Sequence, residues 1–329
     1  MKAIIPVAGI GTKLRPHTHT QPKPLMPVAG KPILGHIVDS LLAAGIREQV
    51  FIIGYLGEKI QEYILHNYSD KIEASFVVQE PRRGLGQALY LCKAHIQATD
   101  GVVVVLGDTI FGDIRQICAI PGNVLGTQEV ADPRKFGVAV RNQHRDIRYF
   151  VEKPHIPTSN LALVGVYKFA DTVLLWNALE ILLKQVRPQG QDYLLTDALN
   201  LMIDLGASFS TYMVENWYDC GGRETLLRTN KILLDRVRTP DYHFPNTVII
   251  PPVHIAAGCQ ISHSIIGPNV AIAENSIIRN SIVENSILGA YSELYSIVLK
   301  DSVVGNDTSL RGKAHRINIG DNTDIDFDE

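Results

Sequence analysis

The chain has 329 residues, of which 46% are hydrophobic, and its formal net charge is −3. This length predicts two domains with ample core, and the acidic balance argues against nucleic acid as a partner, because a nucleic-acid-binding surface is basic. No apolar run is long enough to span a membrane, and we expect no signal peptide, because Met1-Lys2 leads directly into an apolar strand.

The four cysteines are scattered along the chain without a C-x-x-C pair, at positions 92, 118, 220 and 259. Such spacing favours reduced thiols over a disulfide framework or a zinc site. We therefore expect a cytoplasmic protein.

A short buried strand is predicted from Ala3 to Val7, and it leads into the glycines Gly9 and Gly11 and then Thr12. Glycines after a strand let backbone N–H groups approach phosphate oxygens closely. The Walker pattern of phosphate loops is absent. The dinucleotide fingerprint is incomplete, because Leu14 stands where its third glycine belongs.

The loop that follows is stiff and cationic. Prolines at positions 16, 22, 24, 27 and 32 exclude a regular helix, because each removes a donor and restricts the residue before it. The loop carries Lys13, Arg15, Lys23 and Lys31 and no acidic residue. A loop this long in a compact domain is usually functional, and its composition predicts that it binds a polyphosphate.

From residue 33 to about 236 the sequence alternates helical and strand patterns. Helices are predicted at 33–44, 58–66, 85–98 and 223–236, and strands at 50–53, 74–78 and 102–106. This order predicts an α/β fold with a doubly wound, mostly parallel sheet, whose ligand binds beyond the carboxyl ends of the strands.

Two segments lie at such strand ends. Gln79 begins a segment with glycines at 84 and 86, and its amide can donate and accept towards the edge of a base; a simple polar turn explains the same residues. Asp108 ends the most hydrophobic strand, where it can bind Mg²⁺ as an oxygen ligand or cap the next element.

The composition changes at about Asn246, where Ile, Val, Ser, Asn and Gly dominate. Isoleucines recur roughly every six residues, at 249, 255, 261, 266 and 272, and Asn-Ser-Ile then repeats every five residues, from 275, 280 and 285. Short aliphatic periods of this kind predict a parallel β-helix. We therefore expect two domains, 1–238 and 246–329.

The motifs of the first loop resemble the signature of the sugar-1-phosphate nucleotidylyltransferases, the glucose-1-phosphate thymidylyltransferase and uridylyltransferase group. They are Gly9-x-Gly-Thr-Lys-Leu-Arg-Pro16, Pro22-Lys-Pro-Leu-x-Pro-Val28 and Lys31-Pro32. One position departs from the family, which usually has Arg where this chain has Lys13; Arg binds phosphate bidentately and Lys does not. Gly84-Leu85-x-Gln87-Ala88 is most similar to thymidylyltransferases.

This resemblance implies that the substrates are a nucleoside triphosphate and a sugar-1-phosphate, with Mg²⁺ as cofactor. Lys23 would contact the α-phosphate, and the loop from Gly9 to Arg15 the β- and γ-phosphates. The implied catalytic residues are Lys13, Arg15, Lys23 and Lys153, and the implied nucleotide-binding residues are Gly9, Gly11, Thr12, Gln79, Gly84 and Leu85.

The same resemblance implies the metal ligands and the sugar site. Asp108 and Asp219, the latter in Trp217-Tyr-Asp-Cys-Gly221, would hold Mg²⁺. Three further motifs match the sugar half of the family: Phe136-Gly-Val138, Val151-Glu-Lys-Pro154 and Leu163-Val-Gly-Val-Tyr167. They supply Gly137, Glu152, Gly165 and Tyr167, with Lys153 on the sugar phosphate. Leu195-Thr-Asp197 also matches, but thymidylyltransferases often carry a glutamate where this chain has Leu194.

The C-terminal repeats resemble the left-handed hexapeptide-repeat domains of several nucleotidylyltransferases, some of which are coenzyme A-dependent acyltransferases. We favour a structural or oligomerising role, because about eighty residues are available and His254, His263 and His315 lack an evident partner. The predicted activity is nucleotidyl transfer from dTTP or UTP to glucose-1-phosphate in a homo-oligomer. A bifunctional acyltransferase and a non-catalytic nucleotide-sugar regulator stay open.

Overall fold

The computed structural model describes residues 1–143, 146–188 and 190–313. The chain separates into two compact units, Met1–Thr229 and Asn230–Glu329, and the change of unit falls within helix α7 (Arg223–Leu234). The domain boundaries at 238 and 246 remain a prediction, and residues 314–329 of the second domain, including His315, lie outside the described residues. Within the described residues, every helix is too short or too polar to cross a membrane.

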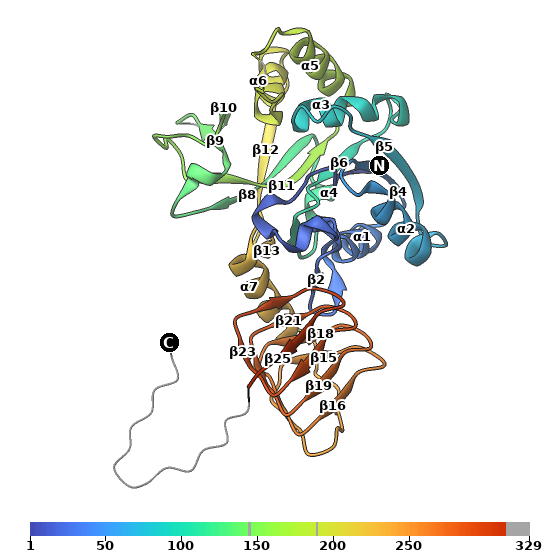
Figure 1. The fold of residues 1–329 in the computed structure, drawn as a ribbon. Coiled ribbons are helices and arrows are strands. Elements are labelled where there is room, and N and C mark those ends of the chain that lie inside the picture. The colour runs from blue at the N-terminus through green and yellow to red at the C-terminus, as the bar shows by residue number, and fades with distance from the viewer. Residues whose placement is uncertain (144–145, 189, 314–329) are drawn as a thin grey trace. The chain divides into compact units, whose positions relative to one another are not determined.

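A nine-stranded sheet forms the centre of the first unit (Figure 1). Its main path is β10-β9-β11-β6-β1-β4-β5, and β8 pairs with both β11 and β12. The portion from β6 through β1 and β4 to β5 is parallel, as the sequence predicts, whereas β11 pairs antiparallel with β6, β8 and β9. The strands are β1 Lys2–Pro6, β4 Glu48–Ile53, β5 Glu73–Val78, β6 Val102–Val105, β8 Asn123–Glu129, β9 Gly137–Arg141, β10 Ile147–Glu152, β11 Leu161–Phe169 and β12 Phe209–Met213.

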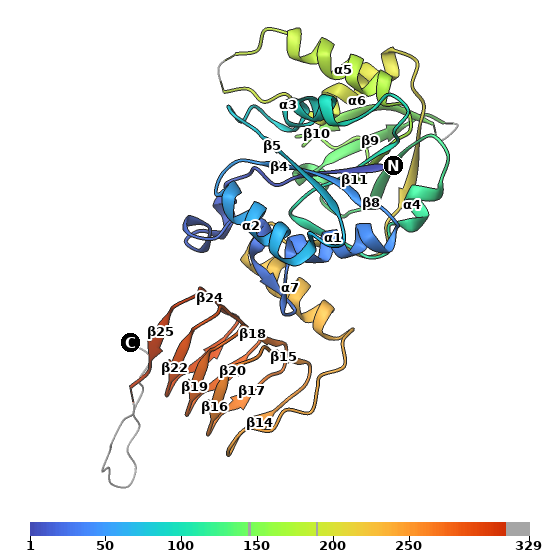
Figure 2. The ribbon, with the colours of Figure 1, turned by 90° about the vertical axis from the view of Figure 1, so that its right-hand side faces the viewer.

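Helices cover both faces of this sheet, which confirms the doubly wound α/β architecture. Figure 2 shows α3, α5 and α6 over one face and α1 and α2 over the other. All four valines of β6 are buried, as in a strand with both faces covered. The helices of this unit, before α7, are α1 Ile33–Ala43, α2 Gly57–Tyr68, α3 Leu85–Tyr90, α4 Arg115–Ala119, α5 Thr172–Lys184 and α6 Leu195–Asp204.

One predicted helix is correct only in part. The segment expected at 85–98 is α-helical from Leu85 to Tyr90 and continues as the 3-10 helix η4, Leu91–His95. Over so few residues an apolar pattern does not distinguish the two hydrogen-bonding patterns, because both return to the same face after three or four residues.

The proline-rich loop contains no α-helix, as predicted. It folds into three 3-10 turns, η1 Thr12–Leu14, η2 His17–His19 and η3 Lys23–Leu25, and then a short hairpin of β2 Pro27–Val28 and β3 Lys31–Pro32. Gly11 has a φ of +71°, and a Cβ there would lie 2.8 Å from the Cβ of Lys23. Glycine is therefore required for the loop to fold back on itself.

The second unit is a parallel β-helix, as expected from the repeats. Its three sheets run along three sides of a prism, and its geometry is that of the hexapeptide-repeat type. Val248 pairs with Ile265, 17 residues on, and Ile282 pairs with Val298, 16 residues on. The sheets are β14 Val248–Ile249, β17 Ile265–Ile266, β20 Ile282–Glu284, β23 Val298–Lys300; β15 Val253–Ile255, β18 Val270–Ile272, β21 Ile287–Leu288, β24 Val303–Val304; and β16 Gln260–Ser262, β19 Ile277–Arg279, β22 Glu293–Tyr295, β25 Ser309–Arg311.

The Asn-Ser repeats form corners of the prism. Asn275, Asn280 and Asn285 have φ angles of +56°, +51° and +42°, in the left-handed region that asparagine tolerates better than most residues. The serine after each is buried, and its hydroxyl donates to a backbone carbonyl; Ser281 Oγ, for example, lies 2.8 Å from the carbonyl oxygen of Arg279.

Candidate active site

A cavity of about 630 Å³ lies in the first unit, beyond the carboxyl ends of β1 and β6. Twelve of the residues predicted from the sequence line it: Gly11, Thr12, Lys13, Lys23, Leu85, Asp108, Gly137, Glu152, Lys153, Gly165, Tyr167 and Asp219. The fold therefore brings the phosphate loop, the two aspartates and the predicted sugar segments together around one cavity. Gly9, Arg15, Gln79 and Gly84 do not line it, and the Arg15 side chain is exposed.

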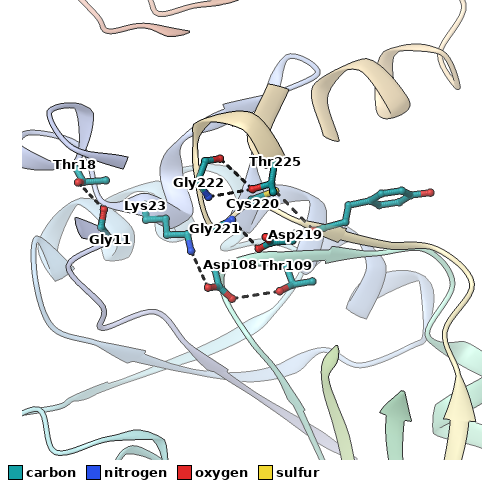
Figure 3. Close-up of polar contacts among 11 residues, drawn as sticks. Gly11, Thr18, Lys23, Asp108, Thr109, Asp219, Cys220, Gly221, Gly222 and Thr225 are labelled. Carbon is teal, nitrogen blue, oxygen red and sulfur yellow. Dashed lines mark hydrogen bonds and ion pairs between the residues drawn. The ribbon is translucent and has the colours of Figure 1, made fainter. Parts of the chain in front are cut away.

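Lys23 and Asp108 form an ion pair inside the cavity, with 2.7 Å between Lys23 Nζ and Asp108 Oδ2 (Figure 3). The lysine side chain is only 12% exposed, whereas the aspartate is 44% exposed. Thr109 Oγ1 donates to the other carboxylate oxygen of Asp108, at 3.3 Å. The ammonium is therefore held in place before any ligand binds.

A two-stranded ribbon brings Asp219 beside Asp108. Strand β13 (Trp217–Asp219) pairs antiparallel with β7 (Thr109–Phe111), and Asp219 stands opposite Thr109. The Cys220 N–H donates to the Asp108 carbonyl oxygen at 3.1 Å, and the Gly221 N–H donates to Asp219 Oδ1 at 2.8 Å (Figure 3). Two carboxylates that are distant in sequence thus share one end of the ribbon.

The carboxylates of Asp108 and Asp219 fit a magnesium ion. Among the described residues no group of three or more His, Cys, Asp or Glu side chains could hold a metal. Mg²⁺ does not need such a group, because proteins often hold it with one or two carboxylates together with substrate phosphates and water. The ammonium of Lys23 on Asp108 shows that this carboxylate already attracts a cation. The neighbouring Cys220 is a less suitable ligand, since burial raises the pKa of its thiol to about 12.

Glu152 is the cavity carboxylate that belongs to the predicted sugar site. Thr196 Oγ1 donates to Glu152 Oε2 at 3.3 Å, and Lys153 Nζ lies 3.6 Å from Oε1. A Cβ on Gly137 would meet the same Oε2 at 3.1 Å. The absence of a side chain at Gly137 therefore leaves room for the carboxylate to face the cavity.

Lys153 occupies an uncommon backbone conformation, with a φ of +42°. Non-glycine residues adopt this left-handed region at a cost, and such strain often occurs at functional sites. The Lys153 N–H donates to the Phe136 carbonyl oxygen at 3.0 Å, which fixes the turn. Its side chain is 65% exposed at the cavity and can reach a bound anion.

Tyr167 is buried beneath the cavity, and burial, together with the nearby Glu152 and Asp108 charges, raises the pKa of its phenol above the ordinary value. The phenol is therefore neutral at physiological pH and keeps its O–H as a possible donor.

Gln79 lies next to the cavity rather than in its wall. Its side-chain Nε2 donates to the Gly84 carbonyl oxygen at 3.0 Å and to Gln87 Oε1 at 2.8 Å. Both amide hydrogens are therefore used within the segment, and the amide oxygen is the group that can accept a hydrogen bond from a base.

The sequence analysis did not name several cavity residues as site residues, and Lys135 and Thr196 are two of them. Lys135 adds a cation at the wall, and Thr196 holds Glu152. Lys135 directly precedes the Phe-Gly-Val motif, and Thr196 is the central residue of Leu195-Thr-Asp197. Both positions could have been proposed from their neighbours. Leu194 also lines the cavity.

A model of the nucleotidyl transferase family matches residues 2–236. The chain is 34% identical to the low-salt glycan biosynthesis nucleotidyltransferase Agl11 of Haloferax volcanii, over 71% of this chain and 66% of that protein. It is 29% identical to a glucose-1-phosphate thymidylyltransferase of Streptomyces antibioticus, over 99% of both chains. The crystal structure of a putative glucose-1-phosphate thymidylyltransferase from Bacillus anthracis, in complex with a sucrose, is similar with a TM-score of 0.62 and 29% identity, over 74% of this chain and 97% of that one.

Proposed function

Because the chain belongs to the nucleotidyl transferase family, we propose that it transfers a nucleotidyl group from a nucleoside triphosphate to a sugar-1-phosphate and releases pyrophosphate. We propose dTTP or UTP as the nucleotide and glucose-1-phosphate as the sugar, in line with the name of the full-length Streptomyces relative. One observation carries this proposal: a single cavity is lined by the glycine-rich cationic loop, by Asp108 and Asp219, and by Glu152 and Lys153.

In the proposed reaction an oxygen of the sugar phosphate attacks the α-phosphorus in line. The bond from that phosphorus to the bridging oxygen breaks, and the electron pair leaves with pyrophosphate. Such transfer depends mainly on positioning and on neutralising charge, so it needs cations more than a protein nucleophile. Four lysines line the cavity, and we propose that three of them, Lys13, Lys23 and Lys153, serve this purpose.

Each of these three lysines has a proposed place. Lys23, held in position by Asp108, contacts the α-phosphate; Lys13, with the backbone N–H groups of the glycine loop, contacts the β- and γ-phosphates; and Lys153 holds the attacking phosphate. When bound between Asp108 and Asp219, Mg²⁺ would neutralise charge on the nucleotide oxygens. Arg15 is absent from the cavity wall, so we assign the terminal phosphates to Lys13.

The proposed sugar site has an acidic and an apolar side. Glu152 accepts hydrogen bonds from sugar hydroxyls, and Thr196 fixes its orientation. Leu194 lines the cavity at a position where a glutamate is common in thymidylyltransferases, so the proposed sugar site has one carboxylate fewer here. A panel of sugar-1-phosphates therefore belongs in the first experiment.

That experiment measures pyrophosphate release by the full chain with Mg²⁺, five nucleoside triphosphates and several sugar-1-phosphates. We expect release with dTTP or UTP and glucose-1-phosphate. Nucleotide-sugar binding without pyrophosphate release under any combination would instead support the non-catalytic regulator.

For the β-helix we propose a structural role in a homo-oligomer. His254 is partly buried, which lowers its pKa, and His263 Nε2 lies 3.0 Å from the amide nitrogen of Asn246. Among the described residues neither histidine forms a pair with a carboxylate. Thiol release from acetyl-CoA would contradict the structural role. We also propose a cytoplasmic location, since all four cysteines are free thiols.

A further inference from the structure

Residues 192–194, which we call the strap, run directly before helix α6 and lie against the predicted base-binding segment. The Tyr193 N–H donates to the Arg83 carbonyl oxygen, and the Gly86 N–H donates to the Tyr193 carbonyl oxygen, both at 2.8 Å. Gly84 has a φ of +92°, and a Cβ there would lie 2.6 Å from the Tyr193 carbonyl oxygen. The strap therefore sets where this segment lies.

The strap also leads to the proposed sugar site. Its last residue, Leu194, lines the cavity, as do Leu195 and Thr196 at the start of α6. Thr196 in turn donates to Glu152 Oε2. A shift of the strap would consequently move groups on both sides of the cavity, the base side through Gly86 and the sugar side through Thr196.

Arg187 holds the strap from outside the cavity. One guanidinium nitrogen donates to the Asp192 carbonyl oxygen and another to Asp197 Oδ2, each at 2.6 Å. The guanidinium also lies over the Tyr193 ring, 5.2 Å from its centroid. The Arg187 side chain is only 14% exposed. A single side chain thus spans the strap, from its first residue to the first turn of α6.

We propose that Arg187 is a positioning residue, which fixes the base-binding and sugar-binding sides of the cavity relative to each other through the strap. The inference rests on the proposed function, and it gives a role to the aspartate of Leu195-Thr-Asp197. Lysine can replace only part of these contacts, because an ammonium lacks the planar fork that reaches two acceptors while stacking on a ring.

The test compares four variants of the full chain: Arg187→Met, Arg187→Lys, Gln79→Ala and Arg115→Lys. Arg115 forms an exposed pair with Asp113, so Arg115→Lys controls for the same substitution outside the strap. Calorimetry gives the Kd for dTTP, steady-state assays give the KM for glucose-1-phosphate, and thermal unfolding gives Tm. We expect Arg187→Met to raise both constants roughly tenfold, the factor that corresponds to the loss of one charged hydrogen bond. Arg187→Lys should lie between Arg187→Met and the unaltered protein, and Arg115→Lys should match the unaltered protein.

The Gln79→Ala variant shows what an effect on the base side alone looks like, because it should weaken dTTP binding and leave the KM for glucose-1-phosphate unchanged. A lower Tm in Arg187→Met with both constants unchanged would mean that Arg187 is only structural and would overturn the inference. A change for one ligand alone would also overturn it. If the unaltered protein released no pyrophosphate, the proposed function would fail, and the dTTP titration would still decide whether Arg187 positions the nucleotide side.

Discussion

Replacing Lys23 with Met separates the catalytic role of this residue from its contribution to stability. Methionine keeps most of the length and apolar stem of the side chain and removes only the ammonium, which lies 2.7 Å from Asp108 Oδ2. Lys2 supplies a control of similar exposure outside the cavity, 16% against 12% for Lys23. Its Nζ lies 2.9 Å from Glu48 Oε2 and 3.4 Å from Asp100 Oδ2.

The structure allows both effects to be estimated. At 2.7 Å the Coulomb attraction is about 1.5 kcal/mol in a water-like medium, which is the relevant limit because Asp108 is 44% exposed. Desolvation of the lysine and loss of side-chain entropy offset part of this, so we expect the free energy of unfolding to change by about 1 kcal/mol or less. Removing one preorganised contact to the reacting phosphate should instead lower turnover on the order of a hundredfold, about 3 kcal/mol.

The assay is pyrophosphate release at saturating substrates, measured beside urea unfolding for Lys23→Met and Lys2→Met. We expect similar small losses of stability in both variants and a large loss of turnover in Lys23→Met alone. If Lys23→Met kept its turnover and lost several kcal/mol of stability, the ion pair would be structural and the reasoning would be refuted.

Three further predictions concern the metal site, the phosphate loop and the dependence of stability on pH. Asp219→Asn should lower Mg²⁺-dependent turnover roughly a hundredfold, whereas Asp113→Asn, at an exposed pair with Arg115, should leave it unchanged; normal turnover in Asp219→Asn would refute the metal assignment. Lys13→Arg should raise kcat/KM several-fold, which corresponds to about 1 kcal/mol of transition-state stabilisation, and it should not tighten the binding of a nucleoside monophosphate. Equal tightening of monophosphate and triphosphate binding would place residue 13 elsewhere in the site. Burial lowers the pKa of His36 in the folded protein. As the pH falls below about 6.5, the unfolded chain therefore takes up the proton first, and the free energy of unfolding falls. The difference between the Tm at pH 7.5 and the Tm at pH 5.5 should be smaller in His36→Gln than in the unaltered protein, and an equal difference would contradict this.

Local features of the site could be predicted from the sequence because they depend on neighbouring residues. Closely spaced prolines exclude a regular α-helix, and the loop folds into 3-10 turns instead. The glycine at position 11 is explained by its left-handed backbone and by its close approach to Lys23. The aliphatic and Asn-Ser periods likewise reflect a repeated local conformation, so the β-helix was predictable.

Long-range pairing could not be predicted from periodicity. Nothing in the pattern of β11 indicates that it lies antiparallel to β6, because an apolar strand buried on both faces is compatible with either direction. The meeting of Asp108 and Asp219 depends on the β7–β13 ribbon, and only the resemblance to a family suggested it. The Arg187–Asp197 pair and the absence of Arg15 from the cavity wall likewise follow from side-chain directions, which sequence spacing does not specify.

The central claim is that this one cavity joins a nucleotide to a sugar phosphate. The most direct measurement incubates the full chain with Mg²⁺, dTTP or UTP and glucose-1-phosphate, and follows both pyrophosphate and the nucleotide sugar. The account predicts that the two products appear in equal amounts and that both disappear when the sugar phosphate is left out. Pyrophosphate release that is independent of sugar phosphate, or no release with any of five nucleotides and the full sugar panel, would contradict it.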